Sequence, residues 1–181
     1  MGQWKDTVDA GSRDDRPPVD VTASLHAEVT AEALFAVVAD LGTYPDWLDI
    51  VPRAESVESS TGDPGPAWSV DLRGQLGPLR RSKRIRMVRA NSEAPSVVRF
   101  ERRELDDRAH SDWVLEARLE PAARGSATTL MMSLHYGGSM WMPMLDRLLA
   151  DEIERSRPRL LEVLAAAGPT RPSGSTGSET S

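Results

Sequence analysis

Apolar residues recur three and four positions apart between Met140 and Ala167, near the end of the chain. That spacing places them on one side of an α-helix, while charged residues such as Asp151 and Arg155 occupy the other sides. The apolar positions are Leu145, Leu148, Leu149, Ile153, Leu160, Leu161 and Leu164. The pattern predicts a long helix that buries one face. Because Pro158 falls inside it, a kink there is favoured over two abutting helices.

The residues before this helix alternate between apolar and polar, as strands with one buried face do. The alternation predicts a first strand over Val19–Leu25 and about six more strands between residues 54 and 136. The connections between these strands are short and contain Gly, Pro or Asp. We therefore expect the strands to form an antiparallel meander.

A short helical segment is expected between the first two strands. Thr30 suits the N-cap of a helix that stops at Gly42, and residues 44–47 suit a turn. Residues 48–52 are expected to form a second short helical turn. The predicted fold class is α+β: a curved antiparallel sheet of about seven strands wrapped around a long C-terminal helix, with one or two short helices after the first strand.

The two ends of the chain lack this patterning. Residues 1–18 hold almost no apolar pattern, and residues 168–181 read GPTRPSGSTGSETS, which is typical of a linker. The sequence thus predicts one folded domain over residues 19–167 between two disordered tails.

The composition excludes several classes of function. A net charge of −6 argues against nucleic-acid binding, and the lack of cysteine excludes disulfides, a thiol nucleophile and cysteine-ligated metal. The basic run Arg80–Arg89 is explained by pairing of the outward Arg84 and Arg86 with acidic neighbours such as Glu101. No apolar run is long enough to span a bilayer, and the N-terminus lacks a signal-peptide core. We therefore expect a cytoplasmic protein without integral membrane association.

The stretch from Thr30 to Glu58 carries a resemblance to a known family. It reads TAEALFAVVADLGTYPDWLDIVPRAESVE, with Asp40 followed by Tyr44-Pro45-x-Trp47 after a short apolar helix. Together with the order of elements, it resembles the START-like (SRPBCC) superfamily, and most closely its bacterial polyketide cyclase/dehydrase-like and lipid-transport-like branch. The resemblance covers Val19 to Ala167. It implies a helix-grip fold with a deep apolar cavity between the sheet and the final helix.

The inward face of the predicted sheet carries no titratable residue at its centre. Its positions are Val70, Leu72, Ile85, Met87, Val98, Phe100, Leu115, Ala117, Leu130, Met132 and Leu134. Burial of these side chains is favourable with or without a ligand, so a filled core remains the alternative to a cavity. The candidate ligand-binding residues are Tyr44, Trp47, Val70, Leu72, Met87, Phe100, Arg102, Trp113, Leu115, Met132, Tyr136, Trp141, Leu145 and Leu149.

Polar inward residues fall at the ends of the strands. Antiparallel pairing is expected to gather Arg81, Lys83, Arg102, Glu104, Ser111 and Tyr136 on one rim, where the final helix begins. The sharper hypothesis is a mouth that recognises a carboxylate or phenolate through Arg102, Tyr136 and Lys83. The alternative is an ordinary solvated strand end with an Arg–Glu pair, which contributes little stability.

Two further groups of aromatic and methionine residues leave alternatives open. Tyr44 and Trp47 either form a lid over the cavity or pack the end of the core. The residues Met140 to Met144, with Trp141 among them, either line the cavity or form an exposed patch at a protein interface.

No catalytic residue, metal site or cofactor is predicted. His26, His110 and His135 share no metal-ligand spacing, and Ser111 and Ser133 lack evident support as nucleophiles. The leading interpretation is a module that binds or carries a small hydrophobic molecule, lipid-like or polyketide-like and with a place for an acidic group. The alternatives are a polyketide cyclase or dehydratase, and a protein-interaction module of the co-chaperone-like or toxin-like kind.

Overall fold

The computed structural model describes residues 19–76, 79–106, 108–123, 126–137 and 142–167. Within these ranges the side chains of residues 19, 74–76, 79–81 and 142–150 lie outside the description. The elements in chain order are β1 (Val19–Ala27), α1 (Ala31–Val38), the 3-10 helix η1 (Leu41–Asp46), β2 (Arg53–Val57), β3 (Ala67–Leu76), β4 (Leu79–Glu93), β5 (Val97–Arg102), β6 (Trp113–Pro121), β7 (Thr128–Tyr136) and α2 (Met142–Ala167).

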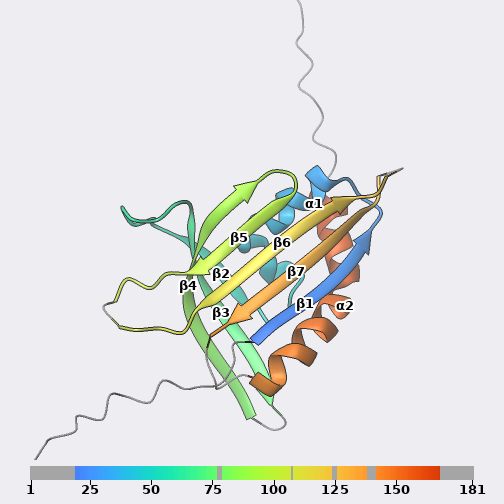
Figure 1. Ribbon diagram of the computed structural model, residues 1–181. Helices are drawn as coiled ribbons and strands as arrows, with labels where there is room; N and C mark the ends of the chain where they lie inside the picture. The colour runs from blue at the N-terminus through green and yellow to red at the C-terminus, as the bar shows by residue number, and fades with distance from the viewer. Residues whose placement is uncertain (1–18, 77–78, 107, 124–125, 138–141, 168–181) are drawn as a thin grey trace, which may run out of the picture.

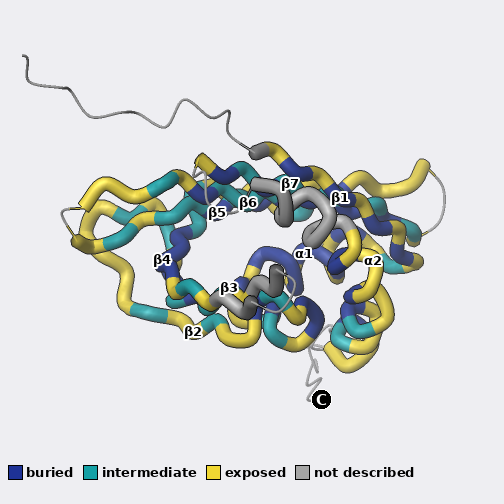
Figure 2. The backbone as a smooth tube through the Cα atoms, turned by 90° about the horizontal axis from the view of Figure 1, so that it is seen from below, coloured by how far each residue is buried: buried dark blue, intermediate teal, exposed yellow. Residues whose placement is uncertain are grey.

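The strands form one antiparallel sheet in the order β1-β7-β6-β5-β4-β3-β2. From β2 to β7 each strand pairs with the next in sequence. β1 pairs with β7 and forms the edge of the sheet opposite β2. Figure 1 shows both helices behind the sheet, and Figure 2 shows the sheet bending around them from β1 to β2. The predicted fold class and meander are confirmed.

The segment after β1 differs from the sequence prediction in its details. Thr30 caps α1 as expected, by accepting a hydrogen bond from the backbone N–H of Ala33 at 3.3 Å. However, α1 ends at Val38 rather than near Gly42, because Asp40 is extended and caps a new 3-10 helix through the N–H of Gly42 at 2.8 Å. The predicted turn at residues 44–47 is part of that 3-10 helix, and residues 48–52 form an irregular turn rather than a second helix.

The final helix α2 is continuous through Pro158, so the alternative of two abutting helices is wrong. Ile153, Leu160 and Leu164 are buried on it as predicted, but Leu161 is 36% exposed. The buried row continues instead through two polar residues, Glu152 and Ser156, which are 2% and 0% exposed. They lie eight and four positions before Leu160, on the same face of the helix.

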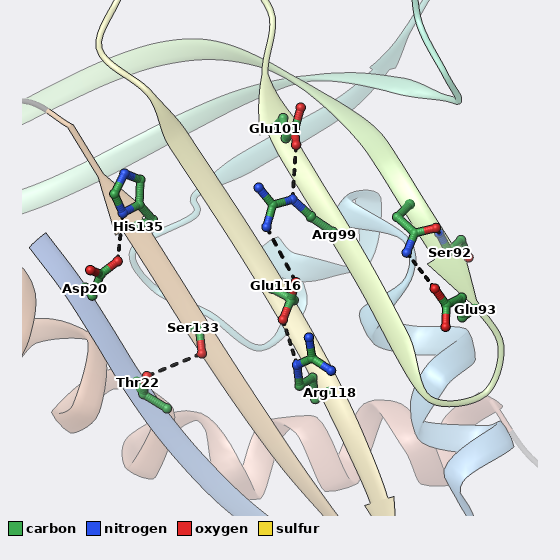
Figure 3. Close-up of polar contacts among 11 residues, drawn as sticks. Asp20, Thr22, Ser92, Glu93, Arg99, Glu101, Glu116, Arg118, Ser133 and His135 are labelled. Atoms are coloured by element: carbon green, nitrogen blue, oxygen red, sulfur yellow. Dashed lines mark hydrogen bonds and ion pairs between the residues drawn. The ribbon is translucent and has the colours of Figure 1, made fainter. Parts of the chain in front are cut away.

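The outer face of the sheet is polar, as the alternation predicts. Figure 3 shows contacts between side chains of neighbouring strands on this face, such as Thr22 with Ser133 at 3.3 Å and His135 with Asp20 at 2.7 Å. The inner face carries the buried apolar residues of every strand from β3 to β7.

Two arginines on the outer face of β4 have different surroundings. Arg84 pairs with Asp71 across to β3, and its side chain is 63% exposed. The side chain of Arg86 is only 9% exposed and pairs with Asp63, whose side chain is 4% exposed, at 2.5 Å. Arg86 also donates to the carbonyl oxygens of Glu58 and Arg103. Both arginines therefore pair with acidic residues as predicted, but the partner of Arg86 is Asp63 rather than Glu101.

We expect Arg86→Met to lower the free energy of unfolding by roughly 3–5 kcal/mol, because it leaves the Asp63 carboxylate buried without its partner. The matched control is Arg84→Met, two residues away on the same face, where solvent surrounds the pair. Urea unfolding of both variants measures the difference. Equal losses in the two variants would show that the Arg86–Asp63 pair is not a buried contact.

The same pair predicts a pH dependence. The hydrogen bond from Arg86 holds the pKa of the Asp63 carboxyl below its usual value. A lowered folded-state pKa contributes stability above the unfolded-state pKa, and this contribution is lost as the pH falls through the folded-state value. The difference in unfolding free energy between the wild type and Arg86→Met should therefore shrink in acid. A difference that stays constant from neutral to acidic pH would contradict this assignment.

Candidate functional site

An apolar cavity of about 60 Å³ lies on the inner face of the sheet. Its lining presents no polar surface. It is lined by Leu41, Tyr44, Leu48, Ile50, Val51, Val70, Leu72, Ile85, Met87, Trp113, Leu115, Met132 and Leu134. Four strands, β3, β4, β6 and β7, form one side of it, and residues 41–51 form the other.

The volume of the cavity limits what it holds without rearrangement. About 60 Å³ is less than the roughly 150 Å³ of an apolar cavity that takes up benzene. Side chains therefore fill most of the space between the sheet and residues 41–51. A ligand larger than a few atoms needs the lining to move.

The wall formed by residues 41–51 is built around the sequence motif Asp40…Tyr44-Pro45-x-Trp47. The Asp40 carboxylate accepts a hydrogen bond from the indole N–H of Trp68 on β3 at 3.1 Å, in addition to capping η1. The Tyr44 hydroxyl donates to the carbonyl oxygen of Val38 at 3.0 Å. Burial raises the pKa of the Tyr44 hydroxyl above its usual value, and the nearby charge of Asp40 adds to the rise.

The structure decides between a lid and a packed core for these aromatic residues. Tyr44 and Trp47 are 1% and 0% exposed, and their ring centroids lie 4.9 Å apart. Both therefore pack the core, and Tyr44 also lines the cavity. Trp47 does not belong to the described lining.

Arg102 and Tyr136 belong to the polar rim described below, and the other predicted site residues fall into three groups. Six of them line the cavity: Val70, Leu72, Met87, Trp113, Leu115 and Met132. Phe100 is 0% exposed and lies edge-on against Trp68, with ring centroids 5.7 Å apart, in the core beside the lining. Trp141 lies outside the described residues, as do the side chains of Leu145 and Leu149 on α2.

Sequence reasoning missed the part of the lining that comes from the turn after η1. Leu48, Ile50 and Val51 all line the cavity, although no periodicity assigns them to an inward face. The available signal is their apolar character in a segment rich in turn residues. Residues 151–167, the part of α2 with described side chains, contribute nothing to the lining; α2 packs mainly along β1.

Polar contacts hold this turn in place. The backbone N–H of Asp49 donates to the buried carboxylate of Glu152 on α2 at 2.6 Å. Arg159, two helical turns further along the same side of α2, donates to both carboxylate oxygens of Asp49 at 2.5 and 2.8 Å. Hydrogen bonding to Arg159 lowers the pKa of Asp49 below its usual value. On the other side, the N–H of Arg73 on β3 donates to the carbonyl oxygen of Ile50 at 2.8 Å.

The predicted polar rim is present at the end of the cavity formed by Trp113. The side chain of Arg102 donates to Glu104 at 2.6 Å and to the carbonyl oxygen of Ser111 at 3.3 Å. Tyr136 packs against Trp113 with ring centroids 4.8 Å apart. Lys83, Arg102, Glu104, Ser111 and Tyr136 thus gather as the register predicts; the side chain of Arg81 is outside the described part. In Figure 1 the end of β7 and the start of α2 lie at the same end of the domain.

Lys83 has the least compensated charge on this rim. Its ammonium lies over the ring of Trp113, 5.9 Å from the centroid. Burial lowers the pKa of Lys83 below its usual value, and the positive charge of Arg102 adds to this while Glu104 opposes it. Among the described residues, no carboxylate lies within ion-pair distance of Lys83.

Arg102 also contacts His110, in the turn before β6. The guanidinium donates to Nδ1 of His110 at 3.1 Å, and Nε2 of the same ring lies 2.6 Å from a carboxylate oxygen of Asp106. Arg102 is therefore held by three partners. In the described part of the chain, no group of three or more His, Asp and Glu side chains is placed to hold a metal ion.

The curved sheet, the long final helix and the apolar cavity with a polar rim define a START-like helix-grip domain. Residues 18–165 match the family model described as polyketide cyclase / dehydrase and lipid transport. The chain belongs to this family.

Solved structures share the fold at low sequence identity. A START superfamily protein from Mycobacterium smegmatis is 14% identical with a TM-score of 0.61, over 82% of this chain and 98% of that one. A protein from Thermus thermophilus is 17% identical with a TM-score of 0.57, over 83% and 100%. The Zhui aromatase/cyclase from Streptomyces sp. R1128 is 17% identical with a TM-score of 0.50, over 83% and 94%. A search of curated proteins finds no significant match.

A transmembrane helix needs about 20 mainly apolar residues. Within residues 19–167, as far as the structure describes them, no helix meets that requirement.

We expect Asp40→Ala to lower the free energy of unfolding by about 2 kcal/mol, because it removes the cap of η1 and leaves the buried indole N–H of Trp68 without an acceptor. The control is Asp46→Ala at the other end of η1, for which no side-chain contact is described. Urea unfolding followed by tryptophan fluorescence measures both variants. Similar stabilities for the two would mean that the Asp40 carboxylate does not organise this wall.

Proposed function

We propose that this domain binds a small hydrophobic molecule between the sheet and the segment 41–51 that covers it. The observation that carries the proposal is the cavity itself, whose lining is entirely apolar and comes from segments far apart in sequence. Its one titratable residue, Tyr44, uses its hydroxyl to bond the backbone of Val38. Such a lining favours hydrophobic contact and offers no group for covalent chemistry.

The cavity can enlarge where its wall is formed by methionine side chains and by the turn 48–51. Met87 and Met132 have unbranched side chains that adopt several shapes, which suits a cavity that adjusts to its ligand. The turn 48–51 is irregular and contributes three lining residues, whereas the strands opposite are fixed by the hydrogen bonds of the sheet. We therefore expect the ligand to displace this turn rather than the strands.

The rim gives the site a polar end. A ligand that spans the cavity and the rim is amphipathic, with an apolar body beside Trp113 and an acidic group near Arg102, Tyr136 and Lys83. Lipid-like and polyketide-like molecules both have this form, in keeping with the family to which the chain belongs.

A second candidate function is a cyclase or dehydratase acting on a polyketide-like chain. The observation that favours it is Tyr136, which is 3% exposed and lies against Trp113 at the end of the cavity. Burial raises the pKa of its hydroxyl, while Ser111 and Arg102 act in the opposite direction. A phenol that keeps its proton can donate a hydrogen bond to a substrate carbonyl.

Native mass spectrometry of the purified protein, followed by denaturing extraction, tests the first proposal against the second. A stoichiometric co-purifying lipid or aromatic acid supports binding and names the class of ligand. A protein that is empty and does not take up an added apolar probe contradicts the binding proposal. An empty protein that takes up the probe and converts polyketide-like thioesters supports the enzyme.

We expect Val70→Phe to weaken binding of the neutral fluorescent probe phenylnaphthylamine at least about ten-fold, because the larger ring fills a cavity of about 60 Å³. The control is Ser133→Phe, which adds the same ring on the outer face of β7. Titration of each variant with the probe measures the affinities, and circular dichroism checks the fold. Equal affinities for the wild type and Val70→Phe would place the probe elsewhere.

A further inference from the structure

We propose that the ligand carries a single negative charge and that Lys83, rather than Arg102, binds that charge. The inference deepens the proposed function and rests on it, since it assigns the polar end of the same site. It is carried by the distribution of charge and hydrogen bonds on the rim.

Arg102 is already committed to protein partners. Its Nε donates to Glu104 at 2.6 Å, and its terminal nitrogens donate to the carbonyl oxygen of Ser111 and to His110. Its side chain is only 6% exposed. An acidic ligand that took Arg102 as its partner would have to displace Glu104 and leave that carboxylate without its ion pair, which is costly at a partly buried position.

Lys83 lies next to the cavity, and no described carboxylate pairs with its ammonium. It pairs in register with Leu72 and lies two residues before Ile85 on the same face of β4, and both neighbours line the cavity. Its ammonium lies over Trp113, a third lining residue. The indole N–H of Trp113 is itself buried without an acceptor among the described residues. Two donors at one end of an apolar cavity thus have no acceptor in the part of the chain that the structure describes.

The charges on the rim set the charge of the ligand. Among the described side chains of the rim, Glu104 cancels one of the two positive charges of Lys83 and Arg102, so that one of these two charges remains. Asp106 lies further out, against His110 and near Arg108. One carboxylate, sulfonate or phenolate neutralises the remaining charge, whereas a doubly charged phosphate would bring an excess negative charge close to Glu104. The site therefore favours a monoanionic amphiphile.

Burial of Lys83 also predicts how binding depends on pH. Its surroundings in the protein alone disfavour the ammonium, which lowers its pKa, and a bound anion favours the ammonium again. Binding of the anion therefore requires the protonated lysine and weakens as the pH rises through its lowered pKa. The charged groups that act on Lys83 are Arg102, at the end of β5, and Glu104, two residues after it.

Two probes that share one ring system test the assignment. Anilinonaphthalene sulfonate carries one negative charge, and phenylnaphthylamine is its neutral counterpart. We expect Lys83→Met in the full-length protein to weaken binding of the sulfonate about ten-fold or more, because a hydrogen bond to a charged group is lost. Binding of the neutral probe should stay within about two-fold of the wild type, since the apolar contacts are retained.

Three further variants serve as controls, and Arg102→Met tests the competing assignment. Arg84→Met, on the adjacent residue of β4 but on the outer face, removes the same charge and should leave both affinities unchanged. Lys83→Arg should retain most of the preference for the sulfonate. Glu104→Gln frees Arg102 and should tighten sulfonate binding.

The outcomes separate this inference from the function on which it rests. If the wild type binds neither probe, the binding function itself fails. If it binds both, but Lys83→Met and Arg84→Met weaken the sulfonate equally, only the net charge of the protein matters and the assignment of Lys83 is overturned. If Arg102→Met alone abolishes the preference for the sulfonate while Lys83→Met has no effect, the charge is bound by Arg102.

Discussion

One helix cannot cover the inner face of a seven-stranded sheet, and the rest of this domain follows from that constraint. A helix with its side chains is about 10 Å wide, whereas neighbouring strands lie about 4.8 Å apart. A helix therefore shields roughly two strands, and α2 packs mainly along β1 at one edge. The strands further along must bury their apolar residues under something else. Here η1 and the turn 48–51 provide that cover, and the space that they leave incompletely filled is the cavity.

The sequence predicts the elements whose patterns repeat. Alternation identifies the strands with bounds that differ by a few residues, and the spacing of Ile153, Leu160 and Leu164 identifies the buried side of α2. The predicted end of α1 is wrong because Asp40 bonds both Gly42 and Trp68, and the second bond depends on a strand that is 28 positions away. A contact over that distance leaves no local pattern.

The candidate site divides in the same way. The lining residues on strands could be predicted, since an inward position is fixed by period two alone. Leu48, Ile50 and Val51 could not be predicted, because an irregular turn has no period.

The buried charged groups were also missed. Glu152 and Arg86 are residue types that normally lie on the solvated surface, and only the turn or loop folded over each of them shows that they are buried. The gathering of rim residues was predictable from register, but the choice between Arg102 and Lys83 depends on which of the two already has a carboxylate partner.

The contacts of Asp49 join the cavity to the last helix of the domain. The backbone N–H of Asp49 bonds Glu152 and its carboxylate bonds Arg159, while Leu48 and Ile50 on either side line the cavity. A shift of this turn therefore alters the anchoring of α2 directly, without passing through the sheet. Such coupling is reciprocal by thermodynamic necessity. Any contact that holds α2 in place from outside also stiffens the turn 48–51, which is one wall of the cavity. The C-terminal helix therefore covers the core and also influences the volume of the cavity.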